Sequence, residues 1–305
     1  MLRRKKVSLL PYIREDVNNL SSVSQTYGWE IQKLNVATAW LKTKGEGITV
    51  AVLDTGCDLD HEDLKPNLLD GINIINKKSA PIDKAGHGTH VSSTIAAADN
   101  GKGMVGVAPR AKIVPVKVLD DDGQGDLKHV IDGIIWAVDR GVDFITMSLG
   151  SPSPAVQLQK ALEYAHKKGV IVFCAAGNSG ENSEIMYPAK YDYSLAIGAI
   201  DENFNRTPFS CSGQELDFLA PGQNILGCVP GNSYALMTGT SMSNPFATGC
   251  GVLLKSYYKQ SGKLNKLKTI DDYINIFKQS ALPLKDGRYH SIKKYEGYGI
   301  INPAF

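Results

Sequence analysis

The sequence lacks a marked excess of either charge and any apolar run long enough to cross a membrane. Its 305 residues carry 33 Lys and Arg against 31 Asp and Glu, which leaves a net charge of +2. A nearly neutral chain gives no electrostatic reason to expect a nucleic acid or an anionic membrane as partner. A membrane-spanning helix needs ~20 consecutive apolar residues, and no run approaches that length. We therefore expect neither kind of partner.

The five cysteines form neither a disulfide framework nor a zinc-binding pattern. Their number is odd, and no Cys-x-x-Cys or Cys/His spacing typical of a zinc site occurs. Cys174 and Cys250 lie in apolar segments, which favours ordinary positions in a core. This usage fits a reducing compartment such as the cytoplasm.

The N-terminus lacks the features of a complete export signal. A basic cluster at residues 3–6 precedes the short stretch "VSLLPYI", which Pro11 interrupts and charged residues 14–16 follow. A signal peptide needs an apolar core of ~7–15 residues and a small-residue cleavage site. We interpret residues 1–22 as an extension of the working protein and residues 23–305 as its main domain. The basic cluster is interpreted as a solvated end.

From about residue 47, apolar runs alternate with helical patterns, and no linker or repeat interrupts them. Strands are expected at 48–54, 111–119, 142–150, 170–177 and 194–200. Helices are expected at 89–98, 127–140, 155–169 and 241–258. Continuous Val/Ile runs separated by helices are typical of parallel strands that are buried on both faces. The sequence therefore predicts a single α/β domain with a mostly parallel central sheet flanked by helices.

Polar residues follow several of these strands, where parallel sheets place their functional loops. Asp54, Ser148 and Asn178 each lie at the end of an apolar run, with a glycine within two residues. Two further loops carry "GHGTHV" with His87 and "GTSMSNP" with Ser241. A glycine within two residues of each of them allows the backbone to approach a ligand closely.

Three of these residues have the chemistry of a serine hydrolase. A serine hydroxyl becomes a nucleophile when a histidine takes its proton and a buried carboxylate orients that histidine. Asp54, His87 and Ser241 supply those groups, and Asn178 offers a donor for the developing oxyanion. Ser241 is expected to open a helix, so its N–H and the helix dipole would face the site.

Other interpretations of the same residues remain open. Asp54 and Asn178 also suit ordinary turns, which Asp and Asn favour. The two histidines of "GHGTHV", His87 and His90, lie three residues apart on one helical face and suit a metal pair. No third ligand with suitable spacing follows them, which argues against that pair.

Several motifs, taken together and in order, resemble the subtilisin-like serine proteases. They are "VAVLDTGCDLDHEDL", "GHGTHV", "VGVAPRAKIVPVKVL", "MSLG", "AAGN", "APG" and "GTSMSNP". The resemblance extends from about residue 27 to "GYGIINP" near the C-terminus. It implies that Asp54 orients His87, that His87 is the general base for Ser241, and that Asn178 stabilises the oxyanion. Thr240 would support Asn178.

The resemblance also implies that the substrate is a polypeptide bound as an extended strand between two edges. One edge corresponds to Gly123, Gln124 and Gly125, and the other to Ser148, Leu149 and Gly150. Main-chain pairing of this kind makes little demand on the substrate's sequence. Met186 falls where the family lines its first specificity pocket, often with glycine, so we expect a shallow pocket that excludes large aromatic side chains.

Calcium is the one metal that the resemblance suggests. The acidic run "LDDDGQGD" fails as an EF-hand, because its twelfth position from Asp120 is Ile131. The family usually binds calcium at a loop ahead of "GVAP", and Asp63 and Asn100 occupy positions where ligands are expected. Asn100 has few oxygen-bearing neighbours in the sequence. A structural calcium ion at Asp63 and Asn100 is therefore a prediction to be tested, with no organic cofactor.

The N-terminal extension resembles that of bacterial intracellular subtilisins, which carry a short Leu-(Ile/Leu)-Pro-Tyr motif. Here the motif is formed by Leu9, Leu10, Pro11 and Tyr12. The resemblance implies that the extension lies across the active site and blocks it, that the enzyme is cytoplasmic, and that a second copy of the chain is a candidate partner. The alternative is that the segment only covers an apolar patch.

Two other functions remain as alternatives to a serine endopeptidase that cleaves unfolded or extended proteins through an acyl-enzyme. One is a non-catalytic relative that only binds peptides, which labelling of Ser241 by a fluorophosphonate would exclude. The other is a nucleotide-dependent α/β oxidoreductase. That enzyme would need G-x-G-x-x-G after the first strand, and "DTGCDLD" does not supply it.

Overall fold

The computed structural model describes residues 5–17, 20 and 24–305. Arg3, Arg4 and the boundary predicted at residue 22 lie outside the described residues. The strands are β1 (Lys6–Leu9), β2 (Ile13–Val17), β3 (Thr49–Asp54), β4 (Ile72–Asn73), β5 (Lys112–Lys117), β6 (Gln124–Asp126), β7 (Phe144–Met147), β8 (Leu149–Gly150), β9 (Ile171–Ala175), β10 (Leu195–Ile200), β11 (Leu216–Pro221), β12 (Ile225–Val229) and β13 (Ser233–Thr238). The α-helices are α1 (Trp29–Lys33), α2 (Val36–Trp40), α3 (His87–Ala96), α4 (Leu127–Asp139), α5 (Val156–Lys167), α6 (Thr240–Gln260), α7 (Ile270–Ser280) and α8 (Lys293–Glu296).

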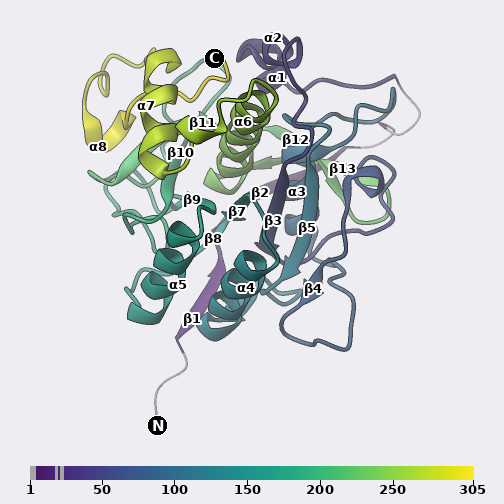
Figure 1. Cartoon of the computed structure of the whole chain (residues 1–305). Helices are drawn as coiled ribbons and strands as arrows, with labels where there is room; N and C mark the ends of the chain where they lie inside the picture. Colours follow the sequence, from purple (N-terminus) through teal and green to yellow (C-terminus); the bar gives the residue numbers. More distant parts are fainter. Residues whose placement is uncertain (1–4, 18–19, 21–23) are drawn as a thin grey trace.

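A seven-stranded parallel sheet forms the centre of the molecule, in the order β11-β10-β9-β7-β3-β5-β4 (Figure 1). Its inner strands β7, β9 and β10 are buried along their whole length, as continuous apolar runs predict. Helices α3 and α6 pack against each other, and so do α4 and α5, so that helix pairs flank the sheet. The predicted α/β fold class is confirmed.

The long helix α6 contacts strands β7, β9, β10 and β11 of the central sheet. Small residues permit this close approach. A Cβ atom at Gly251 would lie 3.1 Å from the ring of Phe173 and 3.2 Å from that of Phe144. The helix begins at Thr240, so close packing against the sheet also fixes the position of Ser241 in its first turn.

The run predicted as one strand at 142–150 is two strands in the structure. β7 belongs to the central sheet and ends at Met147, whereas β8 turns away and pairs with β1. Ser148 lies between the two, at the point where the chain changes sheets. Sequence patterning could not show this break, because both strands are apolar and buried.

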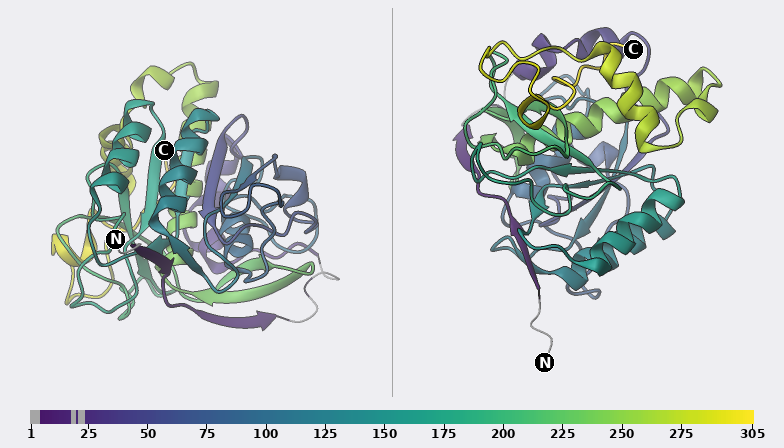
Figure 2. Two further views of the ribbon diagram at one scale, coloured as in Figure 1. Left: turned by 90° about the horizontal axis from the view of Figure 1, so that it is seen from below. Right: turned by 90° about the vertical axis from the view of Figure 1, so that its left-hand side faces the viewer.

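The N-terminal segment contributes one strand to each of two small sheets. β1 lies between β6 and β8, and β2 lies on the outer side of the β12–β13 hairpin. Figure 2 (left) shows β2 running along the green hairpin, with β1 leading into it. Over these residues the extension is therefore an integral part of the sheets around it.

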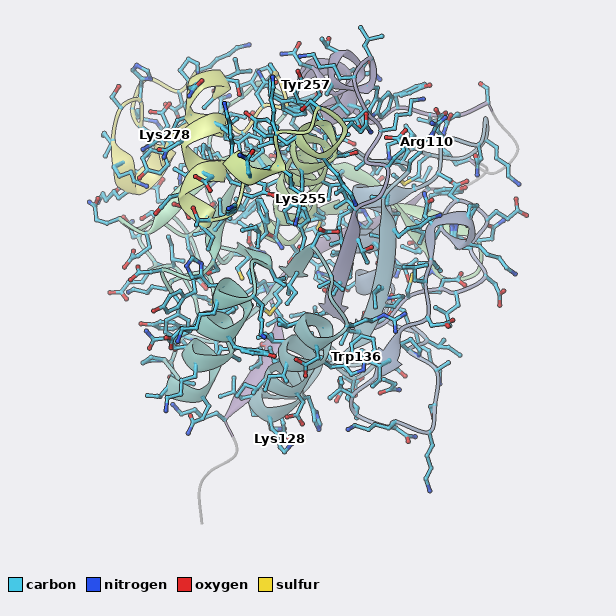
Figure 3. All side chains as sticks on the ribbon, in the orientation of Figure 1. Arg110, Lys128, Trp136, Lys255, Tyr257 and Lys278 are labelled. Carbon is cyan, nitrogen blue, oxygen red and sulfur yellow. The ribbon has the colours of Figure 1, made fainter. Side chains whose placement is uncertain are left out.

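The outer surface carries charge of both signs. Figure 3 shows Arg110, Lys128 and Lys278 projecting from well-separated parts of one face. Lys128 and Asp132 form an ion pair on α4, and Arg110 pairs with Glu46. Within the part of the chain that the structure describes, no helix has the length and apolar character needed to cross a membrane.

Candidate active site

The three residues predicted as a catalytic triad lie at the ends of three different elements, and two of them, Asp54 and His87, are in direct contact. Asp54 is the last residue of β3, His87 is the first residue of α3, and Ser241 is the second residue of α6. All three side chains are completely buried. Helix α3 begins two residues earlier than the sequence pattern suggested, because Gly86 adopts a positive φ of 93° and turns the chain into the helix.

A hydrogen bond orients the histidine. His87 Nδ1 donates to Asp54 Oδ1 at 2.8 Å, and the same oxygen accepts the N–H of Thr55 at 2.8 Å. This contact assigns the proton to Nδ1 and leaves Nε2 as the basic nitrogen. Among the described residues Nε2 has no hydrogen-bond partner, and Ser241 Oγ donates to the main-chain oxygen of Ser148 at 3.4 Å.

Asn178 presents its amide nitrogen to the cleft because Thr240 holds the other end of the amide. The N–H and the hydroxyl of Thr240 donate to Asn178 Oδ1 at 2.9 and 2.7 Å. Nδ2 is therefore the atom that faces the cleft, where it donates to the main-chain oxygen of Pro11 at 2.7 Å. The N–H of Ser241 belongs to the first turn of α6, where helical N–H groups lack partners within the helix.

Sequence reasoning missed a buried carboxylate that shapes the loop before His87. Asp83 accepts hydrogen bonds from the Thr55 hydroxyl and the Gly86 N–H, both at 2.9 Å. It also accepts from the N–H and hydroxyl of Thr89, at 2.9 and 2.7 Å. These contacts fix the first turn of α3 against the loop after Asp54. Asp83 is the one acidic residue between β4 and α3, but no motif in the sequence marks it as a buried acceptor.

A second missed network joins the start of α6 to β7. Asn244 Nδ2 donates to Thr146 Oγ1 at 2.8 Å and to Ser148 Oγ at 3.3 Å. Ser148 Oγ in turn donates to the main-chain oxygen of Ser241 at 2.9 Å. The network ties the residue that ends β7 to the first turn of α6. An Asn three residues after Ser241 on a helix is the only signal that the sequence offered.

His90 has a structural role. Its Nε2 lies 3.0 Å from the main-chain oxygen of Ile225, and burial lowers its pKa to about 3. It is thus a neutral side chain that links α3 to β12. Among the described residues, only His61, Asp63 and Cys228 group closely enough to suggest a shared metal ion, so His87 and His90 do not form such a group.

Both predicted substrate edges line one cleft, and β1 occupies it. β1 is antiparallel to β6, with Val7 opposite Gly125 and Ser8 opposite Gln124. It is also antiparallel to β8, with Ser8 opposite Gly150 and Leu9 opposite Leu149. Leu9 N–H donates to the main-chain oxygen of Gly123 at 2.9 Å. Ser148 contributes its main-chain oxygen at the inner end of the cleft.

The motif that follows β1 lies directly over the catalytic groups. Leu10 is 2% exposed and contacts Gly150, which Met186 also approaches from the same side. The ring of Tyr12 lies 5.0 Å from that of His87. Burial and the negative charge of Asp54 raise the pKa of Tyr12, which keeps its hydroxyl neutral. The segment 9–12 therefore covers the site.

Asp63 and Asn100 come together, but in an arrangement that does not fit a calcium ion. Asn100 Nδ2 donates to Asp63 Oδ1 at 3.0 Å, while Met104 N–H and Tyr234 O–H donate to Oδ2, both at 2.9 Å. Asn100 Oδ1 accepts the N–H of Lys102 at 3.1 Å. Calcium needs oxygen lone pairs, and here N–H and O–H groups already engage them. We derive no role for a metal at this position.

Comparison with known proteins identifies the family. Residues 45–299 match the subtilase family model. The chain is 40% identical to the "Major intracellular serine protease" of Bacillus subtilis (strain 168) over 293 residues, which cover 92% of this chain and 89% of the relative. It is 36% identical to the "Intracellular serine protease" of Paenibacillus polymyxa, covering 97% and 90%. It is 42% identical to "Subtilisin DY" of Bacillus licheniformis, covering 70% and 79%. The chain thus belongs to the subtilase family and is a serine endopeptidase.

Proposed function

We propose that this endopeptidase cleaves unfolded or extended polypeptides through an acyl-enzyme formed on Ser241, and that its own N-terminal extension blocks the site. The observation that supports the first part is the pairing of His87 Nδ1 with Asp54 at 2.8 Å beside an Asn178 amide fixed by Thr240. Base, nucleophile and oxyanion donor then face one cleft lined by two strand edges.

Each group has one step in this reaction. His87 Nε2 takes the Ser241 proton as Oγ attacks the scissile carbonyl carbon, and Asp54 stabilises the resulting imidazolium. Asn178 Nδ2 and the Ser241 N–H stabilise the oxyanion. His87 then gives the proton to the leaving amine, so that the peptide bond breaks and the acyl-enzyme remains. Water, deprotonated by His87, hydrolyses the ester and restores Ser241.

The extension binds like a substrate but is displaced by one residue. The side chain of Leu10 lies against Gly150 and Met186, yet it is the carbonyl oxygen of Pro11 that accepts from Asn178. The residue held by its side chain is therefore not the residue whose carbonyl meets the oxyanion donor. Pro11 also has a fixed φ and no N–H. This mismatch supports a segment that fills the cleft without being cleaved.

Further features of the proposal come from the relatives and from the cleft. Two relatives are named intracellular, which supports a cytoplasmic enzyme, and a second copy of the chain is a candidate partner. Met186 and Leu10 share the space beside Gly150. That arrangement supports a shallow first pocket that prefers aliphatic over large aromatic side chains.

The proposal is tested in the full chain by introducing charged side chains at buried positions of the extension. Val7 and Leu10 are each 2% exposed, so V7D/L10D would bury two carboxylates and should expel the segment. We expect at least tenfold higher cleavage of an unfolded protein, together with faster labelling of Ser241 by a fluorophosphonate. V7D/L10D/S241A is the matched control and should do neither. Equal activity of wild type and V7D/L10D would disprove the block, and absence of labelling in both would disprove the triad.

A further inference from the structure

The loop that carries Asn178 is held from two sides. On one side lies Thr240, whose N–H and hydroxyl donate to Asn178 Oδ1 and whose hydroxyl oxygen accepts the N–H of Gly177 at 3.3 Å. On the other side lies Cys211, a buried residue that takes no part in the proposed reaction. The position of the Asn178 amide therefore depends on contacts from both sides of the loop.

Cys211 contacts the residue before Asn178 and the residue after it. Its N–H donates to the main-chain oxygen of Gly177 at 2.9 Å, and its sulfur accepts the N–H of Ser179 at 3.4 Å. Gly177 has a positive φ of 120°, and a Cβ atom there would lie only 2.8 Å from Cys211 Sγ. The glycine therefore packs directly on the thiol. Asn178 is thus the middle residue of a short segment that Cys211 holds at both ends.

A buried guanidinium fixes Cys211 in turn. Arg206 is 4% exposed, and its Nη2 donates to the main-chain oxygens of Ser210 and Cys211 at 2.6 and 2.9 Å. Its Nε donates to the main-chain oxygen of Tyr295 at 3.1 Å. Because a guanidinium presents its donors in a rigid plane, these carbonyl groups are held in one arrangement. The peptide unit between Ser210 and Cys211 therefore connects the buried charge, through its own N–H, to Gly177.

The chemistry of Cys211 suits a structural contact and not a nucleophile. Burial raises the pKa of its thiol, so the side chain is neutral near pH 7. A neutral thiol is a poor nucleophile and a weak hydrogen-bond acceptor. The sulfur supplies bulk against Gly177 and one weak hydrogen bond from Ser179. Both contacts act on the main chain beside Asn178.

We propose that Cys211 is a positioning residue for the oxyanion donor, because it holds the main chain on both sides of Asn178 while Thr240 orients the amide. The inference rests on the proposed function, in which Asn178 Nδ2 stabilises the oxyanion. Such a donor acts only if it points to the place where negative charge develops in the transition state. Loss of Cys211 should therefore lower kcat and leave KM nearly unchanged.

The test compares Cys211→Ala with Cys211→Ser in the V7D/L10D enzyme, using one peptide amide substrate. Alanine removes both the acceptor and the bulk beside Gly177, whereas serine keeps an acceptor. Loss of an oxyanion donor itself costs ~10²–10³ in kcat, so we expect a fall of roughly tenfold for alanine and less than about threefold for serine. KM should stay within about twofold in both. An unchanged kcat in Cys211→Ala would overturn the inference.

A second buried cysteine provides the matched control. Cys250 lies further along α6 and is as completely buried as Cys211. Cys250→Ala therefore makes the same substitution in the core without removing a contact to the Asn178 loop, and it should leave kcat unchanged. A fall in kcat equal to that of Cys211→Ala would show a general packing defect and would overturn the inference.

A double-mutant cycle shows whether Cys211 acts through Asn178. Cys211→Ala should lower kcat roughly tenfold when Asn178 is present and less than about twofold when Asn178→Ala has already removed the donor. Equal losses in both backgrounds would overturn the inference, because a defect that does not involve the donor lowers kcat whatever residue stands at 178.

The same cycle separates this inference from the proposed function. If Asn178→Ala alone leaves kcat unchanged, the oxyanion role in the proposed function is disproved together with the inference. If Asn178→Ala lowers kcat and the loss from Cys211→Ala adds to it in full, only the inference is disproved. Titration of Ser241 with a fluorophosphonate counts the folded sites, so that kcat refers to folded enzyme in every variant.

Two substitutions keep the test decisive if a variant does not fold. Cys211→Val restores bulk against Gly177 but still lacks an acceptor for the Ser179 N–H, and it replaces Cys211→Ala in the cycle with the same expected dependence on Asn178. Leu10→Asp alone replaces V7D/L10D as the background in which the extension is displaced.

Discussion

The protein holds two buried pairs of histidine and aspartate, and they differ in how far their polar atoms are satisfied. At the cleft, Asp54 Oδ2 and His87 Nε2 have no partner among the described residues. Beside the β12–β13 hairpin, Asp63 accepts from three donors, and both ring nitrogens of His61 are engaged, with the Asp63 N–H and with the Ser233 oxygen. A satisfied buried pair stabilises a fold, whereas an unsatisfied one costs stability and leaves atoms free for chemistry.

The largest effect of a substitution should be on kcat, at the pair Asp54 and His87, whose polar atoms are not fully hydrogen-bonded. Asp54→Asn preserves shape but reverses the hydrogen bond that sets the tautomer of His87. We expect kcat of the V7D/L10D enzyme to fall roughly 10⁴-fold, a magnitude established for serine proteases that include relatives of this chain. The thermal midpoint, measured in the Ser241→Ala background to prevent self-digestion, should change little. A drop in kcat below tenfold would remove Asp54 from the mechanism.

The satisfied pair should show the opposite pattern. Asp63→Asn replaces an acceptor of three hydrogen bonds by an amide that can accept at only one end, which leaves a buried donor without a partner. We expect unfolding in urea to become easier by roughly 2–4 kcal/mol. kcat of the folded fraction should stay unchanged. Loss of kcat without loss of stability would break the comparison between the two pairs.

Glu30 offers a further test of this comparison, because it is a buried carboxylate outside the active site whose hydrogen bonding is incomplete. It lies on α1, which Figure 1 places beside α2 and away from β1. It is 3% exposed, Oε2 lacks a partner among the described residues, and burial raises its pKa to about 7. A raised pKa means that the stability it contributes is present below pH ~4.5 and is lost as the pH rises through 7. Glu30→Gln should therefore stabilise the fold by up to about 3 kcal/mol at pH 8.

The expected pH dependence of Glu30→Gln is itself the control. The difference in unfolding free energy between wild type and variant should shrink steadily as the pH falls from 8 and become small below pH ~4.5, where Glu30 is protonated in both the folded and the unfolded state. A difference that does not depend on pH would show that Glu30 is not ionised at pH 8. Catalysis should be unaffected at every pH.

The smallest effect should come from metal removal. Because Asp63 and Asn100 are joined by a hydrogen bond, a chelator should shift the thermal midpoint of the Ser241→Ala chain by less than about 2 °C, which is under 1 kcal/mol for a chain of this size. Differential scanning calorimetry with and without millimolar calcium measures this shift. A stabilisation of 10 °C or more by calcium would show that the Asp63 region rearranges to bind the ion.

The sequence predicted the parts of this protein that depend on local pattern. Apolar runs indicated the parallel sheet, and glycine-flanked polar residues at strand ends indicated Asp54 and Asn178. The break at Ser148 was not predictable, because it depends on β8 pairing with β1, a segment distant in the sequence. The hydrogen bonds to Asp63 could not be predicted from the sequence for the same reason. One of the donors, Tyr234, belongs to a hairpin far along the chain.

The covalent link between the segment 9–12 and the rest of the chain has a consequence for how the proposed block responds to dilution. A blocking segment joined to its own enzyme acts at a fixed effective concentration, in the millimolar range for a short tether. Dilution of the enzyme or moderate amounts of substrate would then leave it blocked. Once the tether is cut, the same segment becomes an ordinary competitor at the concentration of the enzyme. A single cleavage would thus change a block that is independent of concentration into one that disappears on dilution.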